Sequence, residues 1–287
     1  LRCFGYLRAH WKYAAGAYLM MVLIDLLAMV SPQLIRWTID NGISGRDTTL
    51  LALAVGALLV VVVIKGVFTY FEGLWTETAS QSVAYDLRNE LQRKITLLSF
   101  AFHDNAEAGD LLSRTIQDVE RIRFLTGRAA FRVIEGVFLM LITALVMFSM
   151  NSKLALLAVA AMPLLAIQSI RFGRVFRPLS HQIQKQLSVL TTRVEQNLRG
   201  ARVIKTFAQE EAEIERFEHD NSQWFNLSAE AARLQSFNIP CLQLVTNLSS
   251  VFILFYGGML VVQGGLTLGE LVAFTTYMGQ LIAPVRF

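Results

Sequence analysis

The segment Leu50–Phe71 decides the fold class, and its sequence is LLALAVGALLVVVVIKGVFTYF. Its length is close to the roughly 20 apolar residues that an α-helix needs to cross the hydrocarbon core of a bilayer. A strand of a membrane barrel needs about half that length and alternates apolar with polar residues. The unbroken apolar run Val60–Ile64 shows no such alternation. The segment therefore predicts a transmembrane helix with one charged residue, Lys65.

Five further stretches have the same character, which predicts an all-α membrane protein with six transmembrane helices. The expected spans are 14–35, 50–71, 133–150, 154–170, 239–262 and 268–285. The composition agrees, because 54% of the 287 residues are hydrophobic and only 17% are charged, whereas about one quarter of a soluble domain is charged. The mean hydropathy of +0.46 excludes a disordered chain.

The positions of the Lys and Arg residues predict which ends of the spans face the cytoplasm. All but four of the 26 lie in the segments 1–13, 72–132, 171–238 and 286–287. These four segments share one side of the membrane if successive helices alternate in direction. Because basic residues favour the cytoplasmic side, we expect a multi-pass protein of the cell (inner or plasma) membrane with both termini in the cytoplasm.

The two long cytoplasmic segments, 72–132 and 171–238, are called the first arm and the second arm. Both carry apolar residues at spacings of three and four, which indicates amphipathic helices. We expect each arm to be an antiparallel helix pair that continues the flanking spans for roughly 40 Å, at a rise of 1.5 Å per residue. Arms and spans together would form one domain over residues 1–287.

The tips of the two arms contain the candidate docking residues. At the first tip, Asp104 and Glu107 predict a helix start and Gly109 a helix stop, which gives a short helix across the tip. At the second tip, Phe207 lies beside the acidic run 209–213. Taken by themselves, these residues are compatible either with solvated turns or with docking of a cytoplasmic partner.

Three sets of motifs follow one another along nearly the whole chain. The first is Arg88-x-x-Leu91, Phe102, Gly109-Asp110-Leu111-Leu112-Ser113-Arg114 and Asp118. The second is Glu195-x-x-x-Arg199-Gly200-x-Arg202-Val203-Ile204-Lys205-x-Phe207. The third is Gly264-Gly265-Leu266-Thr267-Leu268-Gly269-Glu270, with Pro284 further on. Their order and spacing resemble the six-helix transmembrane domain of ATP-binding-cassette (ABC) exporters of the bacterial multidrug or lipid type.

The resemblance implies a homodimer or heterodimer of such domains around a central pathway. It also implies that the arm tips are coupling helices, which fit grooves on nucleotide-binding domains. The coupling residues that it implies are Asp104, Asn105, Glu107, Gly109, Asp110 and Leu111 at the first tip and Phe207, Gln209, Glu210 and Glu211 at the second.

ATP and Mg would bind in those nucleotide-binding domains rather than here. The sequence contains no G-x-x-x-x-G-K-[ST] loop, whose backbone N–H groups and Lys would hold the nucleotide phosphates. We therefore expect no cofactor and no enzyme activity in this chain alone. Joined to a fused or separate nucleotide-binding domain, it is expected to be part of a transport ATPase.

Charged residues inside the spans are costly in lipid and point to function. Asp25 and Lys65 lie at similar depth, because each is twenty residues from position 45 in the first outer loop. They could form an ion pair, face an aqueous pathway separately, or include a substrate contact. Two other charges have local explanations: Thr267–Glu270 predicts a helix capping box, and Glu135 can pair with Arg132.

Other chemistry is not indicated. The 4 His and 2 Cys show neither metal-ligand spacing nor a disulfide framework. We expect the lipid bilayer as a partner and no nucleic acid, because basic residues alternate with acidic ones. Aromatic residues in the spans fit a hydrophobic substrate. Two rival functions stay open: a channel or regulatory subunit on the same scaffold, and a secondary transporter that uses Asp25 and Lys65 as an ion relay.

Prolines inside or at the ends of the spans each remove a backbone hydrogen bond and predict kinks, as static bends or as hinges. They are Pro32, Pro163, Pro240 and Pro284.

Overall fold

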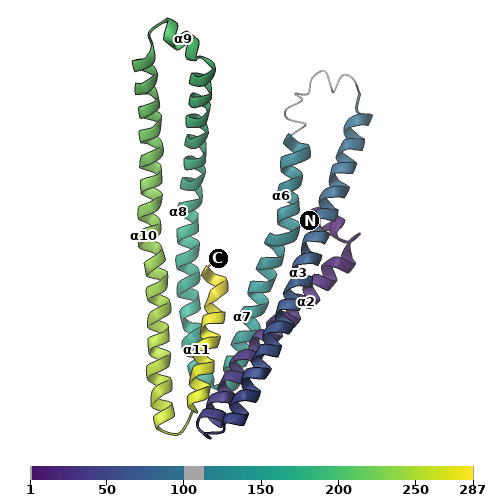
Figure 1. The fold of residues 1–287 in the computed structure, drawn as a ribbon, viewed down its shortest axis with the longest axis vertical. Coiled ribbons are helices and arrows are strands. Elements are labelled where there is room, and N and C mark those ends of the chain that lie inside the picture. The colour runs from purple at the N-terminus through teal and green to yellow at the C-terminus, as the bar shows by residue number, and fades with distance from the viewer. Residues whose placement is uncertain (1, 100–112, 287) are drawn as a thin grey trace. The chain divides into compact units, whose positions relative to one another are not determined.

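The computed structural model describes residues 2–99 and 113–286, and this part of the chain contains helices and no β-strand. Five helices in this described part are long and apolar enough to cross a membrane. The protein is therefore an all-α membrane protein, as its sequence predicts. The long helices are α2 (Trp11–Trp37), α3 (Thr48–Leu97), α7 (Ala130–Met150), α8 (Ser152–Arg199) and α10 (Glu210–Val262) (Figure 1).

The last helix, α11 (Leu268–Ile282), has 15 residues and is followed by the 3-10 turn η4 (Ala283–Arg286). Its length is about 22 Å at 1.5 Å per residue, compared with about 30 Å for a hydrocarbon core. The count of six spans therefore stays a prediction. The remaining short elements are α1 (Arg2–Leu7), η1 (Thr38–Ile43), η2 (Arg114–Asp118), α6 (Val119–Phe124), η3 (Leu125–Ala129) and α9 (Ala201–Thr206).

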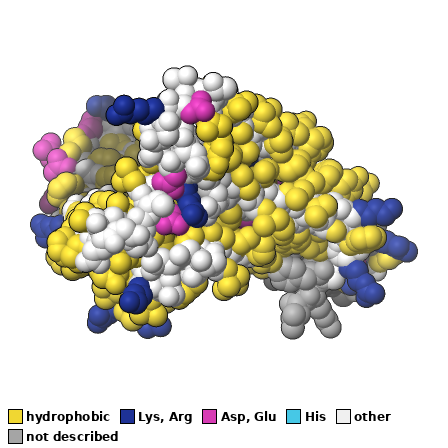
Figure 2. Space-filling model, turned by 90° about the horizontal axis from the view of Figure 1, so that it is seen from below, with side chains coloured by type: hydrophobic (Ala, Val, Ile, Leu, Met, Phe, Trp, Pro, Cys, Tyr) yellow, Lys and Arg dark blue, Asp and Glu magenta, His cyan; other side chains and the backbone are white. Residues whose placement is uncertain are grey.

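Three helices are much longer than a bilayer requires. α3, α8 and α10 contain 50, 48 and 53 residues, so each is more than about 70 Å long. They leave the apolar region without interruption and continue into the arms. In the apolar part, large side chains such as Leu53, Val63 and Leu141 are exposed, and hydrophobic side chains cover most of the face in Figure 2. Such a surface fits a lipid environment.

The chain forms two compact units, one from residues up to Ala155 together with Ile253–Val285, the other from Leu156–Phe252. In the first unit, α11 contacts both α2 and α7, while α3 packs along α2 and against α6. Because α11 has neighbours on two sides, its buried residues are not confined to one stripe. They include Leu271, Ala273, Phe274, Tyr277, Met278, Leu281 and Ile282.

The second unit is built on α8 and α10, which run antiparallel and side by side and are joined through α9 (Figure 1). Polar contacts connect them at several levels. Gln168 Nε2 donates to Asn238 Oδ1 at 3.0 Å, and Arg193 Nε donates to Asp220 Oδ2 at 2.5 Å. These contacts hold the two helices of the second arm in register.

A proline inside α2 is compensated by side chains of α11. Pro32 has no N–H, so the carbonyl of Ala28 loses its usual helical donor. Gln280 Nε2 donates to that carbonyl at 3.2 Å, and Tyr277 Oη donates to the next carbonyl, Met29 O, at 2.5 Å. Because unpaired backbone groups are costly in an apolar interior, these two bonds stabilise the packing of α11 on α2.

Replacement of Tyr277 by Phe tests this contact. The variant leaves a buried carbonyl without its side-chain donor, which we expect to cost about 1 kcal/mol and to lower the unfolding temperature in detergent by a few degrees. Tyr70→Phe is the matched control, since Tyr70 is 66% exposed on α3. Equal effects of the two substitutions on the unfolding temperature would contradict the role of Tyr277.

Candidate functional site

The described part of the first arm is held together by a close approach of α3 to η3. Gly127 and Ser80 are both buried at this crossing. A Cβ atom on Gly127 would lie 2.6 Å from Ser80 Cβ, so any larger residue forces the helices apart. Other buried residues of this part of the arm are Ala79, Val83, Ala84, Val119 and Thr126. Mostly small side chains thus allow the backbones to approach each other.

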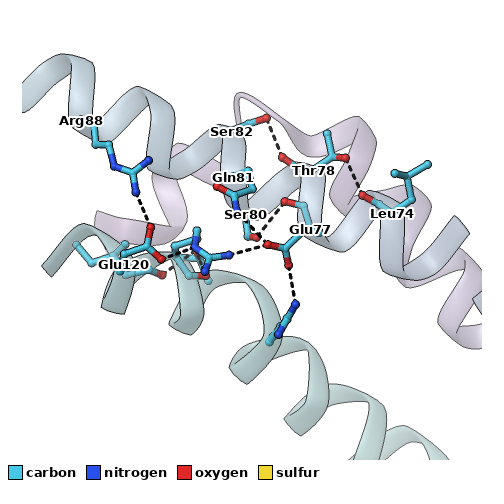
Figure 3. Close-up of polar contacts among 12 residues, drawn as sticks. Leu74, Glu77, Thr78, Ser80, Gln81, Ser82, Arg88 and Glu120 are labelled. Atoms are coloured by element: carbon cyan, nitrogen blue, oxygen red, sulfur yellow. Dashed lines mark hydrogen bonds and ion pairs between the residues drawn. The ribbon is translucent and has the colours of Figure 1, made fainter. Parts of the chain in front are cut away.

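A chain of ion pairs runs along the same interface (Figure 3). Glu77 on α3 interacts with Arg123 at 2.6 Å and with Arg128 at 3.3 Å. Glu120 accepts from Arg123 Nε at 2.8 Å and from Arg88 Nη2 at 2.5 Å. Each exposed pair alone contributes little to stability. The alternation of acids and bases, however, cross-links α3 to α6 and η3 in one register.

The network sets the charge state of Glu120. The hydrogen bond from Arg123, together with the positive charges of Arg123 and Arg88, lowers the pKa of the Glu120 carboxyl below its ordinary value. Glu120 is therefore ionised, and paired, throughout the neutral range.

At the second tip, α9 is followed by Phe207, whose side chain is 68% exposed. Lys205 Nζ lies 2.9 Å from Glu210 Oε1, and this hydrogen bond is the main cause that lowers the pKa of Glu210. Gln209 Nε2 donates to the carbonyl of Phe207 at 3.3 Å, and Glu211 is exposed in the first turn of α10. The tip therefore presents an aromatic ring beside a fixed acidic turn.

The predicted residues of the first tip lie outside the described residues. They are Asp104, Asn105, Glu107, Gly109, Asp110 and Leu111. Their role in coupling stays a prediction.

Acidic residues from three helices, α2, α3 and α7, interact electrostatically in the first unit. Asp25 is 3% exposed, and its Oδ2 atom has no hydrogen-bond partner among residues 2–99 and 113–286. Lys65, Glu72 and Glu135 act electrostatically on it. No salt bridge within 4.0 Å joins Asp25 to Lys65, or Glu135 to Arg132, in the described part of the chain. The pairing of Asp25 with Lys65 stays a prediction.

The opposite end of the first unit contains a polar clamp around the start of α11. The capping box predicted from Thr267 and Glu270 is present. Asp40 of η1 accepts from Gly269 N at 2.9 Å and from Thr267 Oγ1 at 2.7 Å. Arg36 of α2 pairs with Glu270 at 2.7 Å. Since a Cβ on Gly269 would lie 2.4 Å from Arg36 O, glycine is required where α11 meets α2.

Sequence reasoning missed several of these groups. Glu77, Glu120 and Arg123 gave no signal beyond the general alternation of charge in an arm. Arg36 and Asp40 fall between the expected spans 14–35 and 50–71, where the sequence gives no functional signal. In residues 2–99 and 113–286, no three His, Cys, Asp or Glu side chains are disposed to hold a metal ion.

Comparison with known families identifies this architecture. Residues 16–285 match the family model of the ABC transporter transmembrane region. The chain belongs to that family. The resemblance seen in the sequence motifs is confirmed over nearly the full length.

The relatives within this ABC family are about twice as long as this chain. The chain is 32% identical over 279 residues to the ABC transporter ATP-binding protein YknU of Bacillus subtilis. The aligned residues cover 96% of this chain and 48% of that relative. It is 27% identical to an ATP-dependent lipid A-core flippase of Desulfotalea psychrophila (93% and 46% covered). It is 25% identical to the multidrug resistance-like ATP-binding protein MdlA of Escherichia coli (98% and 48% covered). The chain thus spans about half the length of these relatives.

Replacement of Gly127 by Ala tests the helix crossing of this ABC transmembrane region. The new Cβ clashes with Ser80, and such overpacking costs about 1–3 kcal/mol, so the unfolding temperature should fall. Gly66→Ala is the control, since a Cβ on Gly66 meets nothing within 4 Å and Ala favours a helix. The double variant Ser80→Gly/Gly127→Ala should regain part of the loss. An unfolding temperature unchanged by Gly127→Ala would contradict the close approach.

The pH dependence of stability tests the ion-pair chain. Because the pKa of Glu120 is lowered in the folded protein, its contribution is present above its ordinary pKa of 4.5 and is lost as pH falls below that value. Glu120→Gln should therefore unfold at a lower temperature than the unaltered chain at pH 7, and the difference should shrink as the pH falls below 4.5. The exposed Glu230→Gln serves as control. A difference independent of pH would show that the carboxylate charge plays no part.

Proposed function

We propose that this chain forms the substrate pathway of an ATP-driven exporter in the cell membrane, with both termini in the cytoplasm. Its arms couple the pathway to nucleotide-binding domains, which lie in the same or a separate polypeptide and bind ATP and Mg. Two such transmembrane domains, identical or different, would surround a pathway that opens alternately to the two sides. The proposed cargo is hydrophobic.

The observation that carries the proposal is the continuity of the long helices. α8 and α10 run from the apolar region to the second tip as single helices that contain 48 and 53 residues. A packed helix transmits a displacement along its length rather than absorbing it. Movement of the tip by a docked domain would therefore tilt the membrane end, which is the kind of two-state switch that ATP binding can drive.

The tip has the composition of a docking surface. Phe207 exposes an aromatic ring to the outside at the end of the arm, and aromatic residues are common among the anchors of interfaces. The acidic turn around Glu210 can complement basic groups of a partner. The printed functions of the relatives, an ATP-dependent flippase and a multidrug resistance-like protein, support an ATP-driven role with lipid or drug cargo.

Transport in inverted membrane vesicles tests this function. Vesicles that contain the chain together with its nucleotide-binding domain should accumulate a hydrophobic fluorescent dye, or move a fluorescent phospholipid between leaflets, only when Mg-ATP is added. Phe207→Ala should reduce the ATP-driven rate by about tenfold, since an interface aromatic is worth roughly 1.4 kcal/mol or more. Deletion of residues 104–109 should abolish the transport.

The controls separate the rival functions. Phe225→Ala removes a similarly exposed ring from α10 outside the tip (64% exposed) and should leave the transport rate unchanged. If both Phe variants behave alike, the second tip is not the docking site. Transport that is driven by a proton gradient without ATP would overturn the exporter proposal.

A further inference from the structure

The second unit carries three arginines directly after the apolar part of α8. They are Arg171, Arg174 and Arg177, and we call them the basic stripe. Arg171 follows Ser152, the first residue of α8, by 19 positions. At a rise of 1.5 Å per residue this is about 28 Å, close to the roughly 30 Å of a hydrocarbon core. The other two arginines lie about 4.5 and 9 Å further along the helix, so the basic stripe is at the depth of lipid headgroups.

The basic stripe lies on the side of α8 that is turned away from α10. Leu165, Leu179 and Leu190 are buried, and at 100° per residue they lie about 160° around the helix from the centre of the stripe. Gln168 and Gln186, near the same buried side, donate hydrogen bonds to α10 at 3.0 Å. All three arginines are exposed. Packing against α10 therefore directs the arginines outward.

The charge of the basic stripe is not compensated within the described chain. Among residues 2–99 and 113–286, none of its arginines forms a salt bridge or a side-chain hydrogen bond. α8 contains no Asp or Glu before Glu195. By contrast, arginines further along the same arm are paired, Arg193 with Asp220 and Arg199 with Glu195. The basic stripe thus presents three free positive charges on one helix face.

The same face of α8 is apolar at the depth of the hydrocarbon. Leu164, Ile167 and Ile170 precede the basic stripe by up to two turns and are exposed on its side of the helix. One face therefore offers apolar side chains to acyl chains and guanidinium groups to headgroups. This order matches a phospholipid that lies lengthwise along α8, and it differs from what a soluble anion requires.

Arginine is well suited to the phosphate of a lipid. Its planar guanidinium group donates paired hydrogen bonds to phosphate oxygens. Each basic residue near an anionic membrane surface strengthens the attraction by about fivefold. A zwitterionic headgroup gains less, because its own positive charge opposes that of the arginines. The basic stripe should therefore distinguish lipids by the net charge of the headgroup.

We propose that the basic stripe binds the headgroup of an anionic phospholipid in the leaflet from which the second arm emerges. The guanidinium groups bind the phosphate, and the acyl chains lie along Leu164 and Ile167. The contact fixes the depth at which α8 leaves the membrane. The lipid is a bound partner of the second unit rather than the cargo, and its binding does not depend on the proposed export.

Two phospholipids with the same acyl chains test the proposal. Dioleoylphosphatidylglycerol carries a net negative charge, and dioleoylphosphatidylcholine carries none. Their binding to the full chain, without ATP, is measured by native mass spectrometry from a non-ionic detergent, which resolves each bound lipid. We expect the first phosphatidylglycerol to bind about tenfold more tightly or better, with a preference that decreases as the salt concentration rises. Equal affinities for the two lipids would overturn the proposal.

Charge removal locates the preference in the basic stripe. The triple variant Arg171→Gln/Arg174→Gln/Arg177→Gln should bind phosphatidylglycerol at least tenfold more weakly. Its affinity for phosphatidylcholine should be unchanged, which shows that the variant is folded. The corresponding triple replacement by Lys keeps the charge and should retain most of the preference. A full preference in the Gln variant would refute the basic stripe as the site.

A matched variant controls for the overall charge of the protein. Arg199→Gln/Arg202→Gln/Arg216→Gln removes three exposed arginines from the end of the same arm near the second tip. Because these positions lie far from the apolar part of α8, the preference for phosphatidylglycerol should stay as in the unaltered chain. An equal loss in both triple variants would show that net charge alone sets the preference, and the proposal would fail.

A soluble competitor separates a lipid site from a general anion site. Glycerophosphoglycerol is the headgroup of phosphatidylglycerol without its acyl chains, and it should not displace the bound lipid. Displacement at concentrations comparable to those of the lipid would show that the basic stripe binds soluble anions, which would overturn the assignment. These measurements use no ATP, so a failure of ATP-driven transport refutes the exporter and leaves the lipid site intact.

Discussion

Hydrocarbon offers no hydrogen-bond partner to a peptide group, and the rest of this structure follows from that constraint. Every backbone N–H and C=O in the apolar region must be paired within the protein, which explains why the described chain is helical there. Where Pro32 breaks the pattern in α2, the freed carbonyl of Ala28 is paired by Gln280 of α11. A helix defect thus becomes a tertiary contact, and it helps to explain why α11 lies against α2.

Small residues and polar contacts determine where the helices come close. Gly127 on η3 and Gly269 at the start of α11 each occupy a point where a Cβ would collide with a neighbouring element. Polar groups lie beside each crossing. In the first arm they are the linked ion pairs from Glu77 to Arg88, and at the start of α11 they are Asp40 and Arg36. Close packing sets the distance between helices, and ion pairs set their register.

The separation of apolar and charged residues into different regions supports the proposed function. The apolar helices meet lipid, whereas the arms are polar, long and continuous with them.

Much of the fold could be predicted from local properties of the chain. Apolar runs of about 20 residues predict membrane helices, Thr267 and Glu270 predict the capping box that is observed, and ordered motifs predict the ABC family that the comparison confirms. Each of these signals depends on residues close together in sequence. This is why they are visible without coordinates.

Sequence alone determined the membrane class, the helical architecture and the family of this protein. Only the tertiary structure decided which charges meet. Glu77 and Arg123 are 46 positions apart, Glu72 and Glu135 lie on different helices, and Asp40 reaches a helix 229 positions away. A one-dimensional pattern carries no information on which faces of two helices come together. The physical reason is that rotation and crossing of helices are set by side-chain packing between segments that are remote in the chain.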